Sequence, residues 1–382
     1  MFAARKGISS TLLETKRKYK LFCIIQLPPP VHGVSLMNSY VINSQLVNDN
    51  FIVRVVDLKF SKSMKDLEKF SFTKVLRAFT YSIEILKGIL LYKPDLVYFT
   101  IVPTGFAFYR DAFYVLILKM CRQKIVFHLH GKGIKENARK GFLKQLYTWI
   151  FKNEYVICLS QNLTRDLEGL YHSKPFIVPN GIAVQPDRYT RKEKVNNAVP
   201  QILFLSNYIR AKGVLVLIEA LGKLKKEGHQ FKANFVGAPY DLSVEDLNIF
   251  IGQQNLSSCT NIIGPLHGDD KIVEFQNADI FVFPTYNEAF GLVNLEAMQY
   301  SLPVVSTFEG SIPDIVQNNV TGLLAEARNV PMLADKIAVL IKDKNLRIDM
   351  GKKGYERFIN NYTLQHFEEN INRAFETIAR AN

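Results

Sequence analysis

The stretch that decides the fold runs from Ile280 to Gln299 and reads I-F-V-F-P-T-Y-N-E-A-F-G-L-V-N-L-E-A-M-Q. It begins with a short apolar and aromatic run that ends at Pro284, which predicts a buried strand closed by a loop. After this loop, from about Gly291, apolar residues recur at helical spacing, at Leu292, Leu295 and Met298. The stretch therefore predicts a strand, a turn and a helix. The helix N-terminus would lie at the carboxyl end of the strand, where open α/β sheets bind anions and nucleotides.

Two acidic residues mark this stretch. Glu288 lies just before the predicted helix, and Glu296 lies about a turn and a half into it. Eight residues of helix span about 12 Å. That separation suits contacts at opposite ends of one elongated ligand better than a shared acid–base pair. The alternative is a surface helix that carries two solvated acids.

Length and composition favour two α/β domains. The chain has 382 residues, of which 48% are hydrophobic, enough for two sizeable cores. Its four cysteines form no C-x-x-C pair, so neither a disulfide framework nor a zinc site is indicated, and a reducing cytoplasm fits. Because no Asp-x-Asp pair follows a predicted strand, we expect no metal. We also expect no other cofactor.

The net charge of +13 belongs to the N-terminal half. Residues 1–180 carry 27 Lys and Arg against 12 Asp and Glu, whereas residues 181–382 carry 21 against 23. Such asymmetry indicates an anionic partner, either membrane lipid or nucleic acid, unless the source proteome is generally basic. We expect no nucleic-acid partner, because the basic segments lack a recognisable binding module.

The same half carries basic and apolar residues interleaved. Residues 1–19 form a basic arm without the apolar core of a secretory signal, and no stretch is long and apolar enough to span a membrane. Between Phe60 and Tyr92, Lys and Arg alternate with Phe, Leu and Ile. This pattern predicts one or two helices that either contact an anionic membrane surface or carry a solvated basic face.

Strand and helix patterns alternate along the rest of the chain. Expected helices cover 35–46, 111–120 and the apolar stripe of 364–378, and Gly33 precedes the first of them, where its backbone can approach a ligand closely. The expected strands lie at 20–27, 51–57, 95–102, 124–129, 155–159, 176–182, 201–205, 235–239, 261–266 and 302–306.

The segment Glu288 to Glu296, E-A-F-G-L-V-N-L-E, resembles the E-x(7)-E motif of retaining glycosyltransferases of family 4. Other stretches are similar to that family along nearly the whole chain, among them His130-Gly131, the V-P-N-G of residues 178–181 and Lys212-Gly213. The family's Arg position falls on Asn207, which is a departure, and Arg210 is the residue that could substitute. The resemblance implies the GT-B fold, in which two Rossmann-like domains face each other across a cleft and a C-terminal helix crosses back to the first domain.

The resemblance also implies roles for individual residues. Glu288 would hold the donor sugar, Glu296 the ribose, and Lys212 would neutralise the diphosphate. His130 would orient the sugar; we prefer it to His128, which we expect to point to the opposite face of the sheet. The implied donor-binding residues are Gly33, Asn207, Arg210, Lys212, Pro284, Glu288, Ala289, Phe290, Gly291, Leu292 and Glu296.

We expect a basic arm at 1–19, an acceptor-side domain at 20–185, a nucleotide-sugar domain at 186–362 and a returning helix at 363–382. The expected activity is metal-independent, retaining transfer of a hexose from a nucleotide-sugar to a lipid-linked or oligosaccharide acceptor. Such a protein would work in bacterial surface polysaccharide synthesis, on the cytoplasmic face of the membrane. Two alternatives stay open: a sugar-nucleotide epimerase of the same fold, and a non-catalytic, membrane-docked relative.

Overall fold

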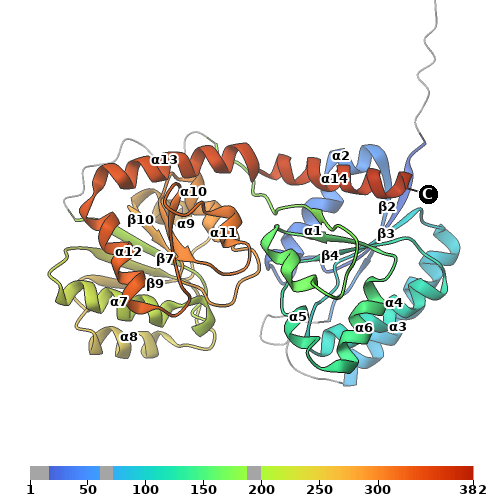
Figure 1. Ribbon diagram of the computed structural model, residues 1–382, viewed down its shortest axis with the longest axis horizontal. Helices are drawn as coiled ribbons and strands as arrows, with labels where there is room; N and C mark the ends of the chain where they lie inside the picture. The colour runs from blue at the N-terminus through green and yellow to red at the C-terminus, as the bar shows by residue number, and fades with distance from the viewer. Residues whose placement is uncertain (1–16, 61–71, 187–198, 382) are drawn as a thin grey trace, which may run out of the picture.

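The chain folds around two six-stranded parallel sheets that lie side by side (Figure 1). The structure is a computed structural model and describes residues 17–60, 72–186 and 199–381. The N-terminal domain is built on the first sheet and the C-terminal domain on the second. The predicted α/β class and the predicted pair of sheet domains are confirmed.

The first sheet has the strand order β2-β1-β3-β4-β5-β6. Its strands are β1 (Tyr19–Ile25), β2 (Phe51–Asp57), β3 (Leu96–Phe99), β4 (Ile125–Leu129), β5 (Tyr155–Cys158) and β6 (Phe176–Ile177). Alternate side chains of β1 enter different cores: Phe22 and Ile24 pack on one face of the sheet, and Leu21, Cys23 and Ile25 pack on the other. Both faces are therefore covered, as a parallel sheet requires.

Different helices cover the two faces of the first sheet. The core containing Phe22 also contains residues of α3, α4 and α6, whereas the core containing Leu21 also contains residues of α1, α2 and the last helix. These helices and their small neighbours are α1 (Gly33–Asn43), α2 (Gln45–Asn50), α3 (Phe72–Tyr92), α4 (Gly105–Met120), α5 (Ile134–Asn137), α6 (Gly141–Phe151) and the 3-10 helix η2 (Asn162–Leu167).

The second sheet has the order β12-β11-β10-β7-β8-β9, so β7 and β10 are central neighbours. Its strands are β7 (Gln201–Leu205), β8 (Lys232–Val236), β9 (Thr260–Gly264), β10 (Ile280–Val282), β11 (Val304–Thr307) and β12 (Gly322–Ala325). The chain proceeds from β7 to β8 on one side and later returns to β10 on the other. The loops after β7 and β10 therefore diverge at a switch point of the sheet, where ligands bind in open α/β folds.

Helices flank the second sheet, and most of its apolar side chains share one large core. They are η4 (Arg210–Lys212), α7 (Val214–Lys226), α8 (Val244–Gln253), α9 (Gly268–Asn277), α10 (Leu292–Gln299), α11 (Ile312–Ile315), α12 (Val330–Lys342) and α13 (Lys344–Asn361). The strand, turn and helix predicted for 280–299 are present as β10 and α10.

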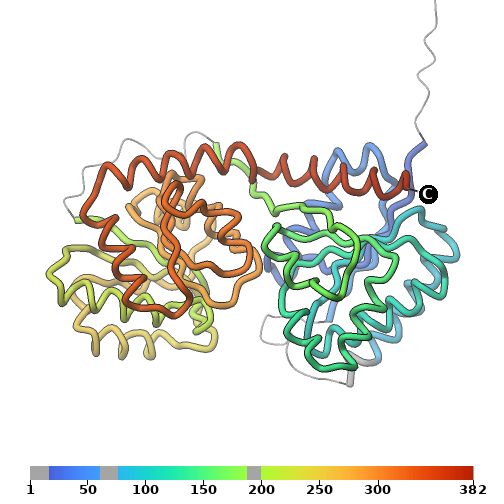
Figure 2. The backbone as a smooth tube through the Cα atoms, viewed as in Figure 1, coloured from blue at the N-terminus to red at the C-terminus, as the bar shows by residue number. Residues whose placement is uncertain are grey.

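The last helix, α14 (Leu364–Arg380), returns to the N-terminal domain, as predicted. Figures 1 and 2 show α13 and α14 running along one side of both domains. The Phe375 ring of α14 lies 5.1 Å from Tyr98 and 5.9 Å from Phe51, between centroids. Where α14 begins, a Cβ on Gly181 would lie 2.2 Å from the Thr363 carbonyl oxygen. Only glycine therefore fits this crossing of the two chain segments.

Two expected elements differ clearly from the observed ones. The first helix ends at Asn43, because Ser44 has extended backbone, and α2 follows as a separate helix. Of the strand expected at 176–182, only Phe176–Ile177 joins the first sheet as β6, and Pro179, which has no N–H to donate to a strand, follows soon after. Ile182 instead forms an isolated parallel bridge with Thr363. The basic arm up to residue 16 and residues 61–71 lie outside the described residues. Among the helices that are described, none has the length and apolar character needed to cross a bilayer.

Candidate functional site

The turn between β10 and α10 brings Glu288 next to Lys212. The Lys212 Nζ lies 2.8 Å from Glu288 Oε2, and both side chains are about one-fifth exposed. Gly291 caps α10 with a left-handed φ of 87°, and within the described structure no side chain caps this helix. The N-terminus of α10 thus remains available to an anion beside the Lys212 ammonium group.

Lys212 is held at this turn by a close approach of two backbones. Gly213 has φ of +81°, and a Cβ at this position would lie 2.0 Å from the Pro284 carbonyl oxygen. Neighbouring backbone and side-chain groups add the hydrogen bonds Tyr286 N to Ala211 O (2.9 Å) and Thr285 Oγ1 to Ala211 O (3.0 Å). The Lys-Gly pair is therefore needed in this order, with the glycine providing the approach and the lysine reaching the site.

Glu296 lies further along α10 and pairs with a residue that sequence reasoning missed. The Lys271 Nζ, on α9, lies 2.7 Å from Glu296 Oε1, and both side chains are about one-quarter exposed. No local spacing signal links positions 271 and 296, because the contact joins two separate helices. A ligand that hydrogen-bonds Glu296 would have to share or displace this ion pair.

The N-terminal domain contributes the opposite wall through His32 and His130. His32 caps α1, since its Nδ1 accepts a hydrogen bond from the Ser35 N–H at 3.3 Å. Both ring nitrogens of His130 are buried, and they have no hydrogen-bond partner among the described residues. Burial and then the neighbouring His32 lower the pKa of His130 to about 3, so its ring is neutral at physiological pH. A neutral, unpartnered imidazole can donate one hydrogen bond to a ligand and accept another from it.

The expected orientation of His128 is wrong. Its ring centroid lies 4.0 Å from that of His130, and its Nδ1 lies 2.8 Å from the Tyr98 hydroxyl. Residues two apart in a strand point to the same face, so alternation places the two rings together. His128 is fully buried behind His130, and this burial keeps its pKa well below the ordinary value. It therefore supports the His130 ring from behind and does not line the cleft.

These residues meet in a cleft of about 460 Å³ between the two domains. The cleft is lined by most of the predicted residues: Gly33, His130, Asn207, Lys212, Glu288, Ala289, Phe290, Gly291, Leu292 and Glu296. Arg210 and Pro284 are not among the described residues that line it. Arg210 is exposed, and its backbone N–H donates to Asp241; Pro284 is buried against Gly213.

The lining also includes His32 and Asn180, which sequence reasoning did not single out as site residues. The Asn180 Oδ1 is buried and without a partner in the part of the chain that the structure describes. Both residues are found in short proline-containing turns after strands, P-P-P-V-H-G and V-P-N-G. The position of such turns at the sheet edge was the only signal that could have found them.

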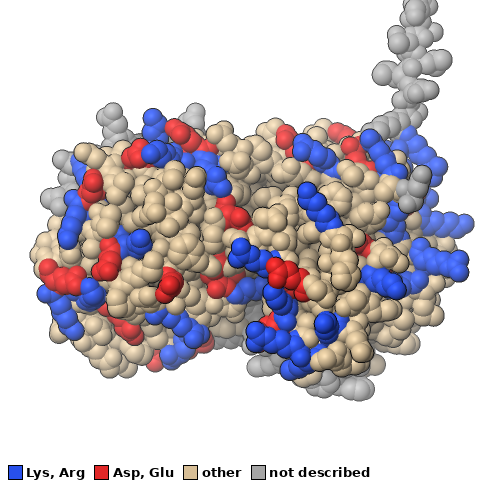
Figure 3. All heavy atoms as spheres, in the orientation of Figure 1, with Lys and Arg blue, Asp and Glu red and all other residues tan. Residues whose placement is uncertain are grey.

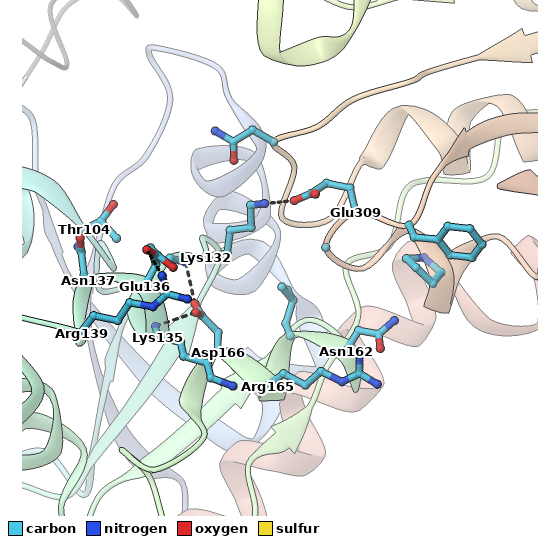
Figure 4. Close-up of a pocket in the computed structure, with 16 residues that line it drawn as sticks. Thr104, Lys132, Lys135, Glu136, Asn137, Arg139, Asn162, Arg165, Asp166 and Glu309 are labelled. Atoms are coloured by element: carbon cyan, nitrogen blue, oxygen red, sulfur yellow. Dashed lines mark hydrogen bonds and ion pairs between the residues drawn. The ribbon is translucent and has the colours of Figure 1, made fainter. Parts of the chain in front are cut away.

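A second chamber of about 820 Å³ adjoins this cleft and also lies between the domains (Figure 4). An ion pair joins Lys132 of the N-terminal domain to Glu309 of the C-terminal domain across it. The Asp166 carboxylate fixes one wall by accepting from the N–H groups of Gly133, Ile134 and Lys135 at 2.8–2.9 Å. Lys135, Arg139 and Arg165 complete a mixed but cation-rich lining. The molecule thus has two adjoining cavities between its domains.

No group of three or more His, Cys, Asp or Glu side chains arranged to hold a metal occurs among residues 17–60, 72–186 and 199–381. The carboxylates of the cleft are each paired with a lysine instead: Glu288 with Lys212, and Glu296 with Lys271. Fixed cations therefore already stand beside both of these carboxylates.

Comparison with known proteins shows which families and folds this chain is similar to. Residues 186–357 match the family model of the glycosyl transferases group 1. The capsular polysaccharide biosynthesis glycosyltransferase CapM of Staphylococcus aureus is 28% identical over 178 residues, which are 46% of each chain. The human alpha-1,3/1,6-mannosyltransferase ALG2 is 25% identical over 66% of this chain and 67% of its own. The match to CapM thus spans about half the length of that relative.

Solved structures agree on the fold of the whole chain. The sucrose-phosphate synthase of Thermosynechococcus elongatus superimposes with a TM-score of 0.74 at 16% identity, over 96% of this chain and all of its own. HepE of Anabaena, solved in complex with UDP-glucose, gives a TM-score of 0.70 at 17% identity, over 94% of this chain and all of its own. The two facing sheets, the returning helix and the matched segment agree: residues 186–357 match the glycosyl transferases group 1 family, and the whole chain has the GT-B fold.

Proposed function

We propose that this protein is a retaining hexosyltransferase that moves a sugar from a nucleotide-sugar donor to an acceptor hydroxyl. The observation that carries the proposal is the Lys212–Glu288 pair at the N-terminus of α10, facing His130 across the cleft. A diphosphate carries the negative charge that Lys212 and the helix N-terminus would stabilise as it leaves. The known complex of HepE with UDP-glucose supports a donor of this kind.

In this mechanism each side chain has one task. Once the diphosphate draws Lys212 away, the Glu288 carboxylate is free to accept from sugar hydroxyls and to position the anomeric carbon. Glu296 would accept from the ribose hydroxyls, and the neutral His130 would hydrogen-bond the sugar from the opposite wall. We assign no nucleophile to the protein. The acceptor oxygen attacks on the side from which the diphosphate departs, and its proton passes to the leaving phosphate oxygen.

The acceptor would enter through the chamber that Lys132 and Asp166 line. We propose a lipid-linked or oligosaccharide acceptor in surface polysaccharide synthesis, at the cytoplasmic face of the membrane. The name of the CapM relative and the basic N-terminal half support this choice. No metal or other cofactor is needed in the proposed reaction, because Lys212 and α10 provide the positive charge.

The first test is a thermal-shift panel of UDP-, GDP-, ADP- and CMP-sugars. A donor present at 100 times its dissociation constant should stabilise the protein by about 2.7 kcal/mol. The anomeric configuration of the transferred sugar, read by NMR, must equal that of the donor. An epimerase would convert the nucleotide-sugar without acceptor, and a non-catalytic relative would leave every donor intact; either result would refute the proposal.

A further inference from the structure

Helix α3 exposes an apolar stripe to solvent. Its members recur at steps of three and four residues, which places them on one side of the helix. They are Leu76, Phe79, Ile83, Leu86 and Leu90, and each is at least 40% exposed. The other side of α3 is also apolar, because Ile85 and Ile89 pack into the core of the N-terminal domain. The exposed stripe is therefore additional to what the fold needs.

The neighbouring helix α4 repeats this arrangement. Its exposed apolar residues follow the same steps and are Phe106, Tyr109, Phe113, Leu116 and Met120. Its core side is formed by Phe108, Tyr114, Val115 and Leu118, all fully buried or nearly so. The two helices pack against each other, and the Tyr114 hydroxyl of α4 donates to the Ala78 carbonyl of α3 at 3.2 Å. We call these ten exposed side chains the α3–α4 face.

The C-terminal domain has no comparable surface among its described residues. Its large exposed apolar side chains are Ile249, Ile263, Val273, Phe308, Val339 and Ile348. These six lie on α8, β9, α9, the segment after β11, α12 and α13, so each stands alone on its element. Scattered exposed apolar residues are normal, whereas a contiguous apolar surface marks an interaction site.

Cations accompany the α3–α4 face. Exposed Arg77 and Lys87 lie on α3, Lys93 follows α3, and Arg122 follows α4, against a single exposed acid on these two helices, Glu84. In Figure 3, Lys and Arg side chains gather along the outer edge of the N-terminal domain. Apolar and aromatic side chains with a basic surround match the interface of an anionic bilayer, where rings and aliphatic groups enter and cations meet lipid phosphates.

The face extends to the mouth of the acceptor chamber. Thr104, which lines that chamber, immediately precedes α4, and Phe106 is 77% exposed two residues later. Phe142, at the start of α6, is 71% exposed close to the chamber residues Arg139 and Lys135 of the preceding segment. A bilayer on this face would therefore hold a lipid-linked acceptor at the opening through which it must enter.

We propose that the α3–α4 face inserts into the interface of an anionic lipid bilayer, with its apolar stripes carrying the affinity and its cations selecting anionic lipid. This deepens the proposed function, on which it rests for the lipid-linked acceptor. The affinity of the protein for the bilayer is thereby assigned to inserted apolar side chains as well as to charge. A second copy of the chain could cover the same stripes, and the experiment separates that occupant from lipid.

The test is cosedimentation of the purified full chain with vesicles of phosphatidylglycerol and phosphatidylcholine, without nucleotide. Phe79→Ser with Phe113→Ser should lower the partition coefficient by about tenfold for each side chain at low salt. The matched control, Ile249→Ser with Ile348→Ser, removes two exposed apolar side chains from the C-terminal domain and should bind as the unaltered chain does. Arg77→Ser with Lys87→Ser should remove the preference for phosphatidylglycerol.

Each outcome of these experiments either supports or overturns the proposed membrane contact. Binding that is absent, or equal in the face variant and the control, overturns the proposal. Light scattering that shows a dimer broken by the face variant assigns the stripes to a second copy and also overturns it. Donor-induced thermal shifts, measured on the same variants, verify their folding. They also test the proposed function independently, since loss of donor binding leaves the vesicle result unaffected.

Discussion

The two domains have the same architecture and different surfaces. Each is a six-stranded parallel sheet covered by helices, yet the N-terminal half carries the whole charge excess and two exposed apolar stripes. The C-terminal domain carries the family motif, and its apolar side chains are mostly buried in one core. The fold by itself therefore does not determine which partner a domain binds. What differs is the use of the surface: in the proposed function one half binds a small anion-bearing donor, and the other binds a larger acceptor at a membrane.

The largest effect that separates the two domains is expected at Lys212, in the C-terminal domain, which we propose binds the donor. We expect Lys212→Ala to lower turnover by about 10²- to 10³-fold, because it removes the cation nearest the departing diphosphate. Steady-state kinetics with the donor identified by thermal shift measures the effect. Arg210→Ala is the matched control: its side chain is exposed outside the cleft lining, so it should change turnover far less. Equal losses in the two variants would show that Arg210 shares the task at the position where Asn207 departs from the family.

Glu296 tests donor binding apart from turnover. We expect Glu296→Gln to weaken the affinity for free nucleotide by about tenfold, because a charged hydrogen-bond acceptor is replaced by a neutral one. Isothermal titration calorimetry measures this affinity. Lys271→Gln, its control, frees the Glu296 carboxylate from its ion pair and should not weaken nucleotide binding. Unchanged affinity in Glu296→Gln would remove the ribose role.

On the N-terminal side, we expect His130 to affect how the stability of the protein depends on pH. Its pKa is lowered to about 3 in the folded protein, while the unfolded chain takes up the proton near pH 6.5. The unfolded state therefore binds more protons between these values, so stability rises with pH across that window and is lost as pH falls below 6.5. His130→Gln should reduce the loss between pH 7 and pH 5 by about 1–2 kcal/mol.

Urea unfolding at pH 7 and pH 5 measures this difference. His128 and His32 also have lowered pKa values, through burial, so the variant should retain part of the acid sensitivity. An identical pH dependence in His130→Gln and the unaltered chain would mean that His130 is protonated or solvated in the folded protein. It would then be unsuited to the neutral role proposed for it.

The smallest expected effect is that of metal removal. We expect transfer activity to survive an excess of EDTA, because Lys212 and the N-terminus of α10 supply the charge that a divalent cation would otherwise provide. The measurement compares initial rates before and after chelation. Full loss of activity that manganese or magnesium restores would contradict the expectation and would require a metal-bound donor.

Local sequence predicted correctly those elements in which apolar residues recur at a regular spacing. The strand at 280–283, the helix after Gly291 and the returning stripe of α14 were each predicted from spacing within a single element. The arrangement of sheets followed from the resemblance to a family. The orientation of His128 was predicted wrongly although its position in the strand was known. Residues two apart in a strand share a face, so His128 and His130 point to the same side and not to opposite sides.

By itself, the sequence determined the α/β class, the turn that presents Glu288, and the basic character of the N-terminal half. Only the tertiary structure decided that Lys271 reaches Glu296, that Lys132 reaches Glu309, and that the described part of the chain leaves the stripes of α3 and α4 exposed. The reason is physical. Periodicity records which residues share a face of one element, but a helix that is apolar on two faces does not record which face the rest of the chain will cover. Contacts between distant elements depend on how the sheets and helices pack, and no local spacing contains that information.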